Sequence, residues 1–452
     1  MPTSIIDSVY YRDMFASPRM HALFSDEARF QGWLDFEAAL ARAQARLGII
    51  PQDAADEITA NATLDNVDVA AMKAEFDRVG FPIVPIVHQL AKAVSEETSR
   101  YVHWGSTTQD VIDSGMALQI RNGLDLLDSL LTEVEDVLLD LAGRHRDTVM
   151  AGRTMQQQAA PVTFGYKVAI WLAEIHRHRD RLAAVRPRAE VGQVAGAVGT
   201  NATLGDRGLD VLRETMAELG LNAAPITWHV SRDGWTEVAM LLGFVGGTLA
   251  KIGQEVAMLM RTEVGEIAEP FETGRGASST LPQKRNPILC QPLVAAGRML
   301  REKAALALDA LVQEHERSIG LHHLEWSILP EAFVLAGGAL ENALEILRGL
   351  VVDEARMQVN LQMTHGLIMS EAVMMGLAPH IGRNQAHDVV YDACAKCADG
   401  GKTLRDVLVA DDRIAKHLSE AEIDAMLDPA NYLGVAPQMV DQVIALVLAA
   451  RE

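Results

Sequence analysis

Four long stretches of helical periodicity constrain the fold of this chain more than any other feature. In the first, residues 111–143, apolar side chains recur every three or four positions, at Leu124, Leu127, Leu131, Val134, Leu138 and Leu141. Similar stretches cover residues 162–185, 235–267 and 288–316. A typical globular helix has about 11–12 residues, and a longer amphipathic helix buries its stripe against neighbours of similar length. The sequence therefore predicts a central bundle of long helices.

The segments on either side of this predicted bundle are shorter. Proline interrupts the early pattern, for example at Pro18 and Pro51, and glycine-containing stops separate the late segments. The chain is rich in Ala, Leu and Met, with only 5% aromatic residues, a mixture that favours helix, and no alternating strand pattern of useful length is present. We predict an all-α fold with an N-terminal helical domain (residues 1–110), a central bundle (111–352) and a C-terminal helical domain (353–452).

The third long stretch carries four glycines, at Gly243, Gly246, Gly247 and Gly253. Each glycine destabilises a helix by about 1 kcal/mol relative to alanine, so a compensating interaction is expected. We favour close approach of two helices, including helices of different subunits; a flexible segment is the alternative.

The charge balance argues against two classes of partner. The chain has 40 Lys and Arg against 61 Asp and Glu, a formal net charge of −21, whereas nucleic acids and anionic membranes are bound by basic faces. The most apolar run, residues 238–250, is shorter than the ~20 residues that span a bilayer, and the N-terminal residues lack the pattern of a signal peptide. We therefore expect a cytoplasmic protein that binds neither nucleic acid nor membrane.

The three cysteines predict neither a metal site nor a disulfide framework. Cys394 and Cys397 are spaced as CxxC and Cys290 stands alone, but no second CxxC or His pair supplies further zinc ligands. We interpret Cys394 and Cys397, which fall in a helical stretch, as reduced structural thiols, and expect no metal.

One loop, residues 271–287, concentrates groups that can carry chemistry. Glycines, three consecutive hydroxyl residues and two cations follow one another between Gly274 and Arg285. Asn286 and Pro287 have the pattern of an N-cap and a first helical residue, and a helix N-terminus attracts anions such as carboxylates. The composition is compatible with a loop that closes over an anionic substrate, but on its own it favours an ordinary polar connection between helices.

The exact sequence of this loop favours the first of these two interpretations, a loop that closes over a substrate. GASSTLPQKRNP, residues 276–287, resembles the signature GSSxMPxKxNP of the fumarase/aspartase superfamily, with Ala for the first Gly and Leu for Met. The resemblance implies that Ser278 is the base that removes a proton next to a carboxylate, with Ser279 beside it in contact with substrate. Lys284 and Asn286 would bind that carboxylate. A serine hydroxyl is a poor base, so cations and backbone N–H groups would have to stabilise its alkoxide in a closed loop.

Two further segments resemble conserved regions of the same superfamily. YVHWGSTTQDVID, residues 101–113, is similar to the first region, in which Thr107 and Thr108 would hydrogen-bond a substrate carboxylate and His103 lies close by. GRTMQQQAAPVT, residues 152–163, is similar to the second region, in which Thr154 and Gln157 would contact substrate.

Within the superfamily the chain is most similar to 3-carboxy-cis,cis-muconate cycloisomerases, relatives of adenylosuccinate lyases. The stretch QEHERSIGLHHLEW places Arg317 where a guanidinium would point into the site and bind a carboxylate. His315 and His323 are either polar members of the site or structural residues. Residues that serve the nucleotide in adenylosuccinate lyases are missing: Met14 stands for an arginine, Trp326 stands for another, and no His-Asp-Val motif occurs near residue 70.

A second departure concerns the proton donor. Many relatives carry a histidine where this chain has Met155, and some carry one where it has Gln158; neither side chain here can deliver a proton. His103 and His229 are the candidate donors, unless the reaction needs none. The absence of a proton donor at these two positions fits closure of a lactone by a carboxylate better than loss of an amine, because a carboxylate needs no protonation.

The resemblance thus implies a three-region, all-helical protomer in a homotetramer with a twenty-helix core, with active sites shared between subunits and no cofactor. We expect addition or elimination next to a carboxylate of a small polycarboxylate, in particular cycloisomerisation of 3-carboxy-cis,cis-muconate to its carboxylactone in aromatic catabolism (the beta-ketoadipate pathway). The alternatives are a C–N lyase releasing fumarate from an N-substituted aspartate, of iminodisuccinate or adenylosuccinate type, and a scaffold that has lost its chemistry.

Overall fold

The computed structural model describes residues 3–451, apart from the side chains of residues 398–400. The described chain is mostly helical and packs into two compact units. Unit 1 contains the described residues up to Thr132 together with His178–Ala250 and Pro292–Asn342. Unit 2 contains Glu133–Arg177, Lys251–Gln291 and the described residues from Ala343 onward. The division of the sequence into residues 1–110, 111–352 and 353–452 stays a prediction.

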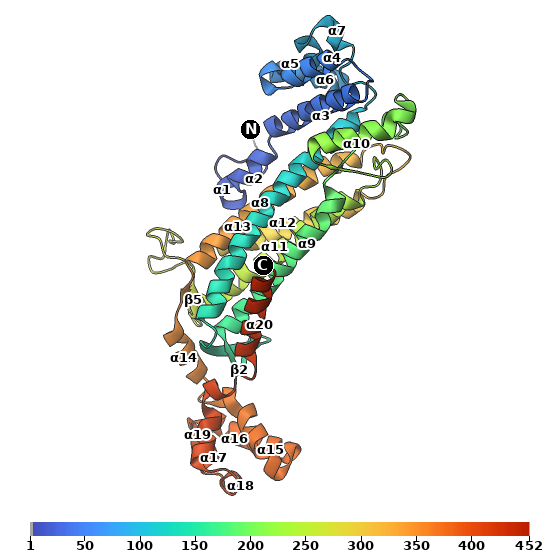
Figure 1. Ribbon diagram of the computed structural model, residues 1–452. Coiled ribbons are helices and arrows are strands. Elements are labelled where there is room, and N and C mark those ends of the chain that lie inside the picture. Colours follow the sequence, from blue (N-terminus) through green and yellow to red (C-terminus); the bar gives the residue numbers. More distant parts are fainter. Residues whose placement is uncertain (1–2, 452) are drawn as a thin grey trace. The chain divides into compact units, whose positions relative to one another are not determined.

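Long helices run through both units, and in unit 1 their segments lie side by side (Figure 1). They are α8 (Thr108–Arg144), α9 (Phe164–Ala189), α11 (Asp233–Leu259), α12 (Cys290–Asp309) and α13 (His322–Arg348). On α8, Gly123 faces the Phe333 ring of α13, so closely that a Cβ would lie 2.9 Å from it. The predicted bundle of long helices is confirmed.

Shorter elements complete unit 1. Its N-terminal helices are α1 (Arg12–Phe15), α2 (Pro18–Leu23), α3 (Asp26–Arg46), α4 (Gln52–Asn61), η1 (Leu64–Asn66), α5 (Val69–Val79), α6 (Ile83–Ala93) and α7 (Glu96–Ser99). Between α9 and α11 lie β3 (Val191–Gly192), η2 (Gly205–Arg207), α10 (Gly208–Leu219) and β4 (Asn222–Ala223), with β3 parallel to β4. Ser25 opens α3 as an N-cap whose hydroxyl accepts the N–H of Ala28.

Unit 2 contains small sheets that the sequence does not predict. Strand β1 (Val149–Thr154) pairs antiparallel with β2 (Gln157–Thr163), and β5 (Ile267–Ala268) pairs antiparallel with β6 (Val351–Val352). The remaining elements are α14 (Glu354–Gln362), η3 (Leu367–Met369), α15 (Ser370–Ile381), α16 (Arg383–Gly400), α17 (Leu404–Val409), α18 (Asp412–Ala415), α19 (Glu420–Leu427), η4 (Pro429–Asn431) and α20 (Ala436–Ala449).

The ends of two long helices differ from the prediction. Helix α11 stops at Leu259 rather than near residue 267, because Gly265, with φ 64°, turns the chain into strand β5. Helix α12 begins at Cys290 and ends at Asp309, inside the predicted range 288–316. The predicted N-cap at Asn286 and helix start at Pro287 are therefore wrong.

The glycines of α11 serve a helix crossing within unit 1. A Cβ on Gly297 of α12 would lie 2.4 Å from the carbonyl oxygen of Gly246, and one on Gly243 would lie 3.0 Å from the Cβ of Ala304. Gly247, in contrast, has no atom within 4 Å of an ideal Cβ. Close approach, rather than flexibility, thus explains Gly243 and Gly246, and contact with another subunit stays a prediction for Gly247.

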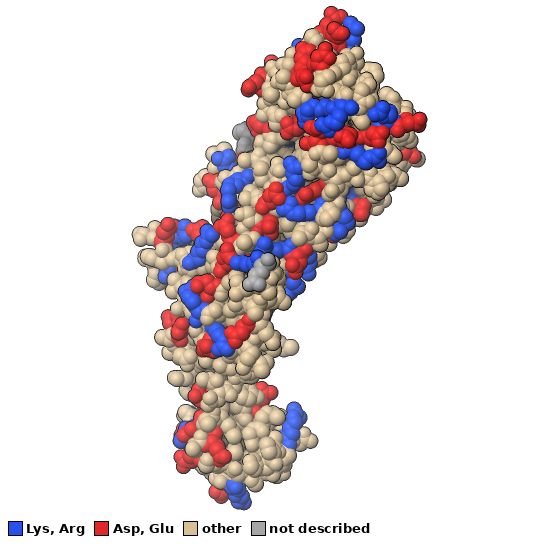
Figure 2. Space-filling view, viewed as in Figure 1, with Lys and Arg blue, Asp and Glu red and all other residues tan. Residues whose placement is uncertain are grey.

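Helix α11 is also, among the described residues, the helix long and apolar enough to cross a bilayer, but 61% of its most apolar window is buried within the chain. This is the burial of a core helix. On the face of the molecule shown in Figure 2, Lys and Arg lie among Asp and Glu rather than in one basic patch, as expected for a chain of this acidity.

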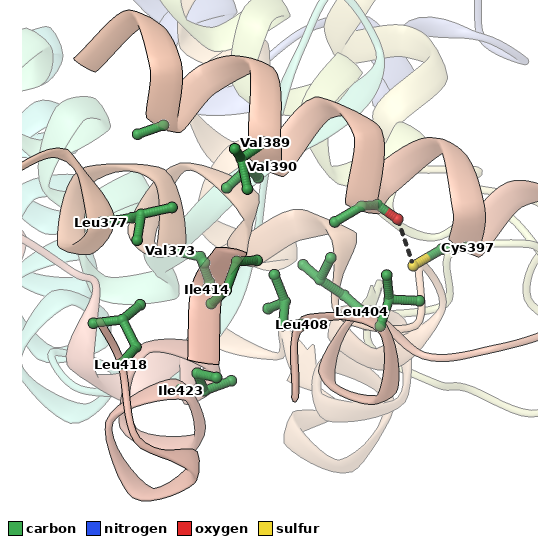
Figure 3. Packing of buried hydrophobic residues seen from close by; sticks show 13 residues of the cluster. Val373, Leu377, Val389, Val390, Cys397, Leu404, Leu408, Ile414, Leu418 and Ile423 are labelled. Atoms are coloured by element: carbon green, nitrogen blue, oxygen red, sulfur yellow. Dashed lines mark hydrogen bonds between the residues drawn. The ribbon is translucent and has the colours of Figure 1, made fainter. Parts of the chain in front are cut away.

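The core of α15 to α19 encloses the CxxC cysteines (Figure 3). Cys397 lies among buried residues such as Leu404 and Leu408, and its thiol donates to the carbonyl of Ala393 at 3.3 Å. Burial raises the pKa of the Cys397 and Cys394 thiols, and both cysteines are free. The packing of Cys397 fits the predicted structural role, and the reduced state stays a prediction.

Candidate active site

The N-terminus of α8 presents the two predicted threonines in unit 1. Thr107 precedes the first helical residue, Thr108, and the Thr107 N–H donates to Oδ2 of Asp110 at 3.0 Å. Oδ2 of Asp110 also accepts the N–H groups of Ala195 and Gly196, at 3.1 and 3.0 Å. A buried carboxylate with three backbone donors thus fixes the start of α8.

Arg317 reaches this helix start from the segment that precedes α13. Its Nη2 lies 3.5 Å from Oγ1 of Thr107 and 3.1 Å from the carbonyl oxygen of Ala197, and its Nε donates to Oε1 of Gln109 at 2.9 Å. Nη1 has no hydrogen-bond partner among the described residues. The side chain is exposed, so a guanidinium edge and a threonine hydroxyl face solvent together, an arrangement suited to a carboxylate.

His229 is buried behind this helix start. Its ring is 1% exposed, and its Nε2 lies 2.9 Å from Oδ1 of Asp110. Nδ1 has no hydrogen-bond partner among the described residues. Since the nitrogen that has a partner faces Asp110 and the ring has almost no contact with solvent, the geometry of His229 fits support of Asp110 rather than proton donation.

His103 is more accessible, with a side chain 22% exposed. Its Nδ1 lies 2.6 Å from Oε1 of Glu37 on α3 and 3.0 Å from Oγ of Ser106. Burial alone lowers the pKa of the His103 imidazole, but the charge and hydrogen bond of Glu37 and the charge of Asp110 outweigh it, so the pKa is raised above 6.5. The sequence does not single out Glu37 as a functional residue, since 66 residues separate it from His103.

A buried ion cluster underlies the same region of unit 1. Arg232, with a fully buried side chain, donates to Asp113 of α8 at 2.8 and 3.0 Å and to Glu325 of α13 at 3.0 Å. The rings of Trp228 and Trp235 lie 4.6 and 4.4 Å from its guanidinium carbon. Burial raises the pKa of Glu325, partly offset by Arg232. The cluster joins α8, α11 and α13. The sequence does not predict these contacts, because Arg232 lies 93 and 119 positions along the chain from its two carboxylate partners.

The second region forms the tip of the β1–β2 hairpin in unit 2. Thr154 pairs with Gln157, and the two residues between them, Met155 and Gln156, have φ of 50° and 69°. Positive φ at both central residues is the geometry of a type I′ turn, which favours Asn and Gly, so this tip is strained. Thr154, Met155 and Gln157 are all exposed, whereas Gln158 points inward and donates to the carbonyl of Asn360 at 3.0 Å.

The hairpin is anchored directly below its tip by a buried carboxylate. Arg153 donates from Nη1 and Nη2 to the two carboxylate oxygens of Glu266, at 2.8 and 2.7 Å, and Asn360 donates to Oε1 of Glu266 at 2.8 Å. Glu266 has no exposed surface. The exposed tip is therefore held by a buried contact at the residue next to it.

The signature loop is closed on itself in unit 2. Ala277 bridges to Arg285, and both the backbone N–H and the side-chain amide of Asn286 donate to the carbonyl of Gly276, at 3.1 and 3.0 Å. Gly276 has φ 70°, and a Cβ there would lie 2.6 Å from the carbonyl oxygen of Asn286. Only glycine fits this position.

Inside the loop, Ser278 Oγ accepts two backbone N–H groups, from Thr280 at 3.3 Å and Leu281 at 3.1 Å. Two donors directed at one oxygen would stabilise an alkoxide there. Ser279 and Lys284 are exposed, and Lys284 forms no ion pair with any described residue. The loop therefore holds its serine oxygen in place and leaves a cation free.

The helix that follows the loop is capped by the chain itself. The two oxygens of Glu269, 3% exposed, accept the N–H groups of Leu289 and Cys290, at 3.2 and 2.7 Å. Glu269 thus occupies the anion site that the sequence assigns to an incoming carboxylate. This replaces the predicted role of Asn286 as N-cap, because Asn286 is held at Gly276 instead.

The remaining histidines of interest lie around the start of α13. The ring of His323 is centred 4.4 Å from the ring of Trp326 and 4.0 Å from that of His322. Burial, and then the charge of His323, lowers the pKa of His322. His315 is exposed, with φ 53°. Trp326 lines a cavity of about 360 Å³ in unit 1, together with Trp33 of α3.

The predicted site residues thus fall into three local groups. Thr107, Thr108 and Arg317 meet at the start of α8, near His103; Thr154 and Gln157 share the hairpin tip; Ser278, Ser279, Lys284 and Asn286 share the signature loop. Among residues 3–451, no group of three or more His, Cys, Asp or Glu side chains is placed to hold a metal ion.

Comparison with known proteins gives concordant matches. Residues 13–299 match the lyase family, and residues 366–443 match the adenylosuccinate lyase C-terminus. The 3-carboxy-cis,cis-muconate cycloisomerase of Pseudomonas aeruginosa is 45% identical over 95% of this chain and 95% of its own length. Trans-aconitate decarboxylase 1 of Mycosarcoma maydis is 41% identical over 96% of this chain and 88% of its own. The crystal structure of the 3-carboxy-cis,cis-muconate lactonizing enzyme from Pseudomonas putida matches with a TM-score of 0.93 at 39% identity, covering 98% of this chain and all of that one.

Proposed function

This chain belongs to the fumarase/aspartase superfamily of lyases and is an enzyme of that superfamily, and on this premise we propose that it converts 3-carboxy-cis,cis-muconate to its carboxylactone. The general reaction is addition or elimination at a carbon next to a carboxylate of a small polycarboxylate. The 45% identical cycloisomerase and the lactonizing enzyme of the same fold support the specific substrate.

The observation that carries the chemistry is the position of Ser278. Its Oγ accepts two backbone N–H groups, from Thr280 and Leu281, in a loop whose Lys284 has no ion-pair partner among the described residues. A group that passes a proton to or from carbon must exist as hydroxyl and as alkoxide, and these donors stabilise the alkoxide.

The bonds change as follows in the lactone-forming direction. One carboxylate oxygen of the substrate bonds to an alkene carbon, and the π electrons move to the carbon next to a second carboxylate. Ser278 Oγ–H protonates that carbon and then recovers a proton from water, so each turnover takes up one proton. Arg317, Thr107, Thr108 and Lys284 hold the carboxylates.

The other predicted residues take supporting roles in this proposal. Asn286 orients the loop and contacts a carboxylate, Ser279 contacts substrate beside Ser278, and Thr154 and Gln157 contact it from the hairpin tip. Met155 cannot donate a proton, which lactone closure tolerates, because the attacking group is an ionised carboxylate.

The cavity beside Trp326 supports a substrate without a nucleotide. Its wall is aromatic, and the cations that line it are already paired: Arg29 lies 2.5 Å from Asp26, and Lys73 lies 2.5 Å from Asp77. A phosphate would have to displace these carboxylates, so adenylosuccinate is disfavoured.

We further propose a cytoplasmic homotetramer in which the first region, second region and signature loop of three subunits meet in each active site. Ser278→Ala changes the signature loop, whereas Arg317→Ala changes the segment before α13. Mixed and reassembled, the two inactive variants should regain part of the activity, because some sites then receive both intact segments. Activity that stays absent after proven subunit exchange would argue for sites within single chains.

The function is tested with a panel of carboxymuconate, trans-aconitate, an iminodisuccinate-type compound and adenylosuccinate. Carboxymuconate should be consumed, followed by ultraviolet absorbance, and Ser278→Ala should abolish turnover with the tetramer intact. Ser327→Ala, an exposed serine on α13, should leave turnover unchanged. Fumarate released from the aspartate derivatives alone would assign the C–N lyase reaction instead, and turnover of trans-aconitate alone would assign the chemistry of the relative that is 41% identical.

A further inference from the structure

We infer that Glu37 is a positioning residue that holds His103 as an imidazolium, whose second N–H, on Nε2, can donate to a substrate carboxylate. The inference rests on the proposed function in one respect: it assumes an anionic substrate at the start of α8. It deepens that function by naming the group that gives the site a second cation beside Arg317.

The first argument is the burial of Glu37. The residue is 2% exposed on α3, between Phe36 and Ala38, which are 0% and 5% exposed. Its Oε1 lies 2.6 Å from Nδ1 of His103, and its Oε2 has no hydrogen-bond partner among the described residues. A carboxylate this deeply buried needs a cation close by, and the hydrogen bond at Oε1 identifies His103 as that partner.

The second argument is the geometry of His103. Its backbone has φ 60°, a left-handed conformation that is strained for a non-glycine residue, and its Nδ1 is directed at Glu37. An ionised Glu37 accepts a hydrogen bond, so Nδ1 carries the proton. Protonation of the ring then places the second N–H on Nε2, where Ser106 Oγ, at 3.5 Å, is the hydrogen-bond neighbour among the described residues.

The third argument comes from the charges around the ring. Glu37 faces it from α3 and Asp110 acts on it from α8, and both favour the charged form; burial opposes them without prevailing, and the pKa of His103 is raised. His229 also lies near Asp110 but is 1% exposed with Nε2 directed at that carboxylate. Of these two histidines, His103 is the one with solvent access.

A purely structural role for Glu37, as an anchor for the segment after α7, predicts something different. An anchor could be replaced by a glutamine that keeps the hydrogen bond to Nδ1, with no effect on when His103 titrates. A carboxylate that holds an imidazolium cannot be replaced by glutamine in this way, because the neutral amide does not stabilise the positive charge. Glu37→Gln therefore separates the two roles, and Glu37→Asp, which keeps the charge, should restore much of the wild-type behaviour.

The test measures the titration of His103 in the assembled enzyme without substrate. Exchange of the imidazole Cε1 hydrogen in D2O, read by mass spectrometry of the peptide that contains His103, gives its midpoint. We expect a wild-type midpoint above 6.5, a fall of about one to three pH units in Glu37→Gln, and a smaller fall in Glu37→Asp. Glu75→Gln is the matched control, because Glu75 pairs with Nδ1 of the exposed His88 at 2.9 Å; it should leave His103 unchanged.

Two results would overturn the inference: a wild-type midpoint below 6.5, or a Glu37→Gln midpoint equal to that of the wild type. The first needs no variant, so it decides even if Glu37→Gln fails to assemble. With an active substrate, the alkaline limb of kcat/KM should follow the same midpoints, because activity is lost as His103 loses its proton. If no substrate on the panel is turned over, the proposed function fails while the exchange experiment still decides the role of Glu37.

Discussion

Arg317 lies beside Thr107, with Nη2 3.5 Å from Oγ1, although 210 residues separate them in the sequence. The contact links the segment before α13 to the start of α8. We expect Arg317→Lys to lower kcat/KM by about 10- to 100-fold, since hydrogen bonds to charged groups contribute about 1.5–3 kcal/mol each and lysine cannot reproduce the guanidinium fork.

Arg207→Lys is the control for this prediction. Arg207 is exposed, lies 3.6 Å from Asp210 and donates to the carbonyl of Leu47. Steady-state kinetics of both variants on the active substrate would check the prediction. If the arginine binds the substrate in its ground state, the loss in Arg317→Lys appears mainly in KM. Wild-type kinetics in Arg317→Lys would remove Arg317 from the site.

Gly276 and Gly274 form a matched pair in the signature loop. Both have positive φ, 70° and 88°, but a Cβ on Gly276 would meet the carbonyl of Asn286 at 2.6 Å while one on Gly274 meets nothing within 4 Å. Both alanine variants carry the backbone strain of about 1–2 kcal/mol; only Gly276→Ala also displaces Asn286. We expect Gly276→Ala to lose at least ten-fold more kcat than Gly274→Ala, with both variants eluting like the wild type in size-exclusion chromatography.

The Arg232 cluster should dominate the stability of unit 1. Removing one member of a buried ion pair costs about 3–5 kcal/mol, because the partner is left charged and unpaired, and Arg232→Met leaves two such partners, Asp113 and Glu325. Urea denaturation followed by circular dichroism should show a large fall in midpoint. Arg213→Met, which breaks an exposed pair with Asp210, should leave the midpoint nearly unchanged; an equal fall in both would contradict the prediction.

The crossing of α11 and α12 predicts opposite effects for two glycines. Gly297→Ala places a Cβ 2.4 Å from the carbonyl of Gly246, so the helices must separate and the protein should be destabilised. A Cβ on Gly247 would meet no atom of the described residues within 4 Å, so Gly247→Ala should add about 1 kcal/mol of helix stability. Thermal denaturation measures both. Dissociation of the assembly in Gly247→Ala would instead place Gly247 at a subunit contact.

Hydrophobic periodicity predicts the long helices well, because their burial follows one regular stripe. For α8 the expected range 111–143 differs from Thr108–Arg144 by a few residues at the N-terminus and one at the C-terminus. Periodicity fails where local hydrogen bonding, in a hairpin or at a helix cap, determines the structure. The β1–β2 hairpin has no alternation to reveal it. Asn286-Pro287 has the pattern of a helix start, although Glu269, which precedes the loop, supplies the cap.

The motifs predict which residues gather in the candidate site, but not what supports them. Ser278 and Arg317 lie in recognisable segments, whereas Glu37 and Arg232 act through partners distant in sequence. One signal for Glu37 was available: it is an acidic residue on the apolar face of α3, one turn after the buried Trp33. A charge on a buried stripe requires a partner, and the sequence does not name it.

The hairpin tip has a consequence for how this enzyme can change. The pairing of Thr154 with Gln157 and the anchor at Glu266 hold the stem, and Met155, 97% exposed, contributes nothing to that support. Selection can therefore replace the tip side chain, and with it gain or discard a proton donor, without disturbing the scaffold. Divergence among such enzymes can proceed one exposed residue at a time, on an architecture that stays constant.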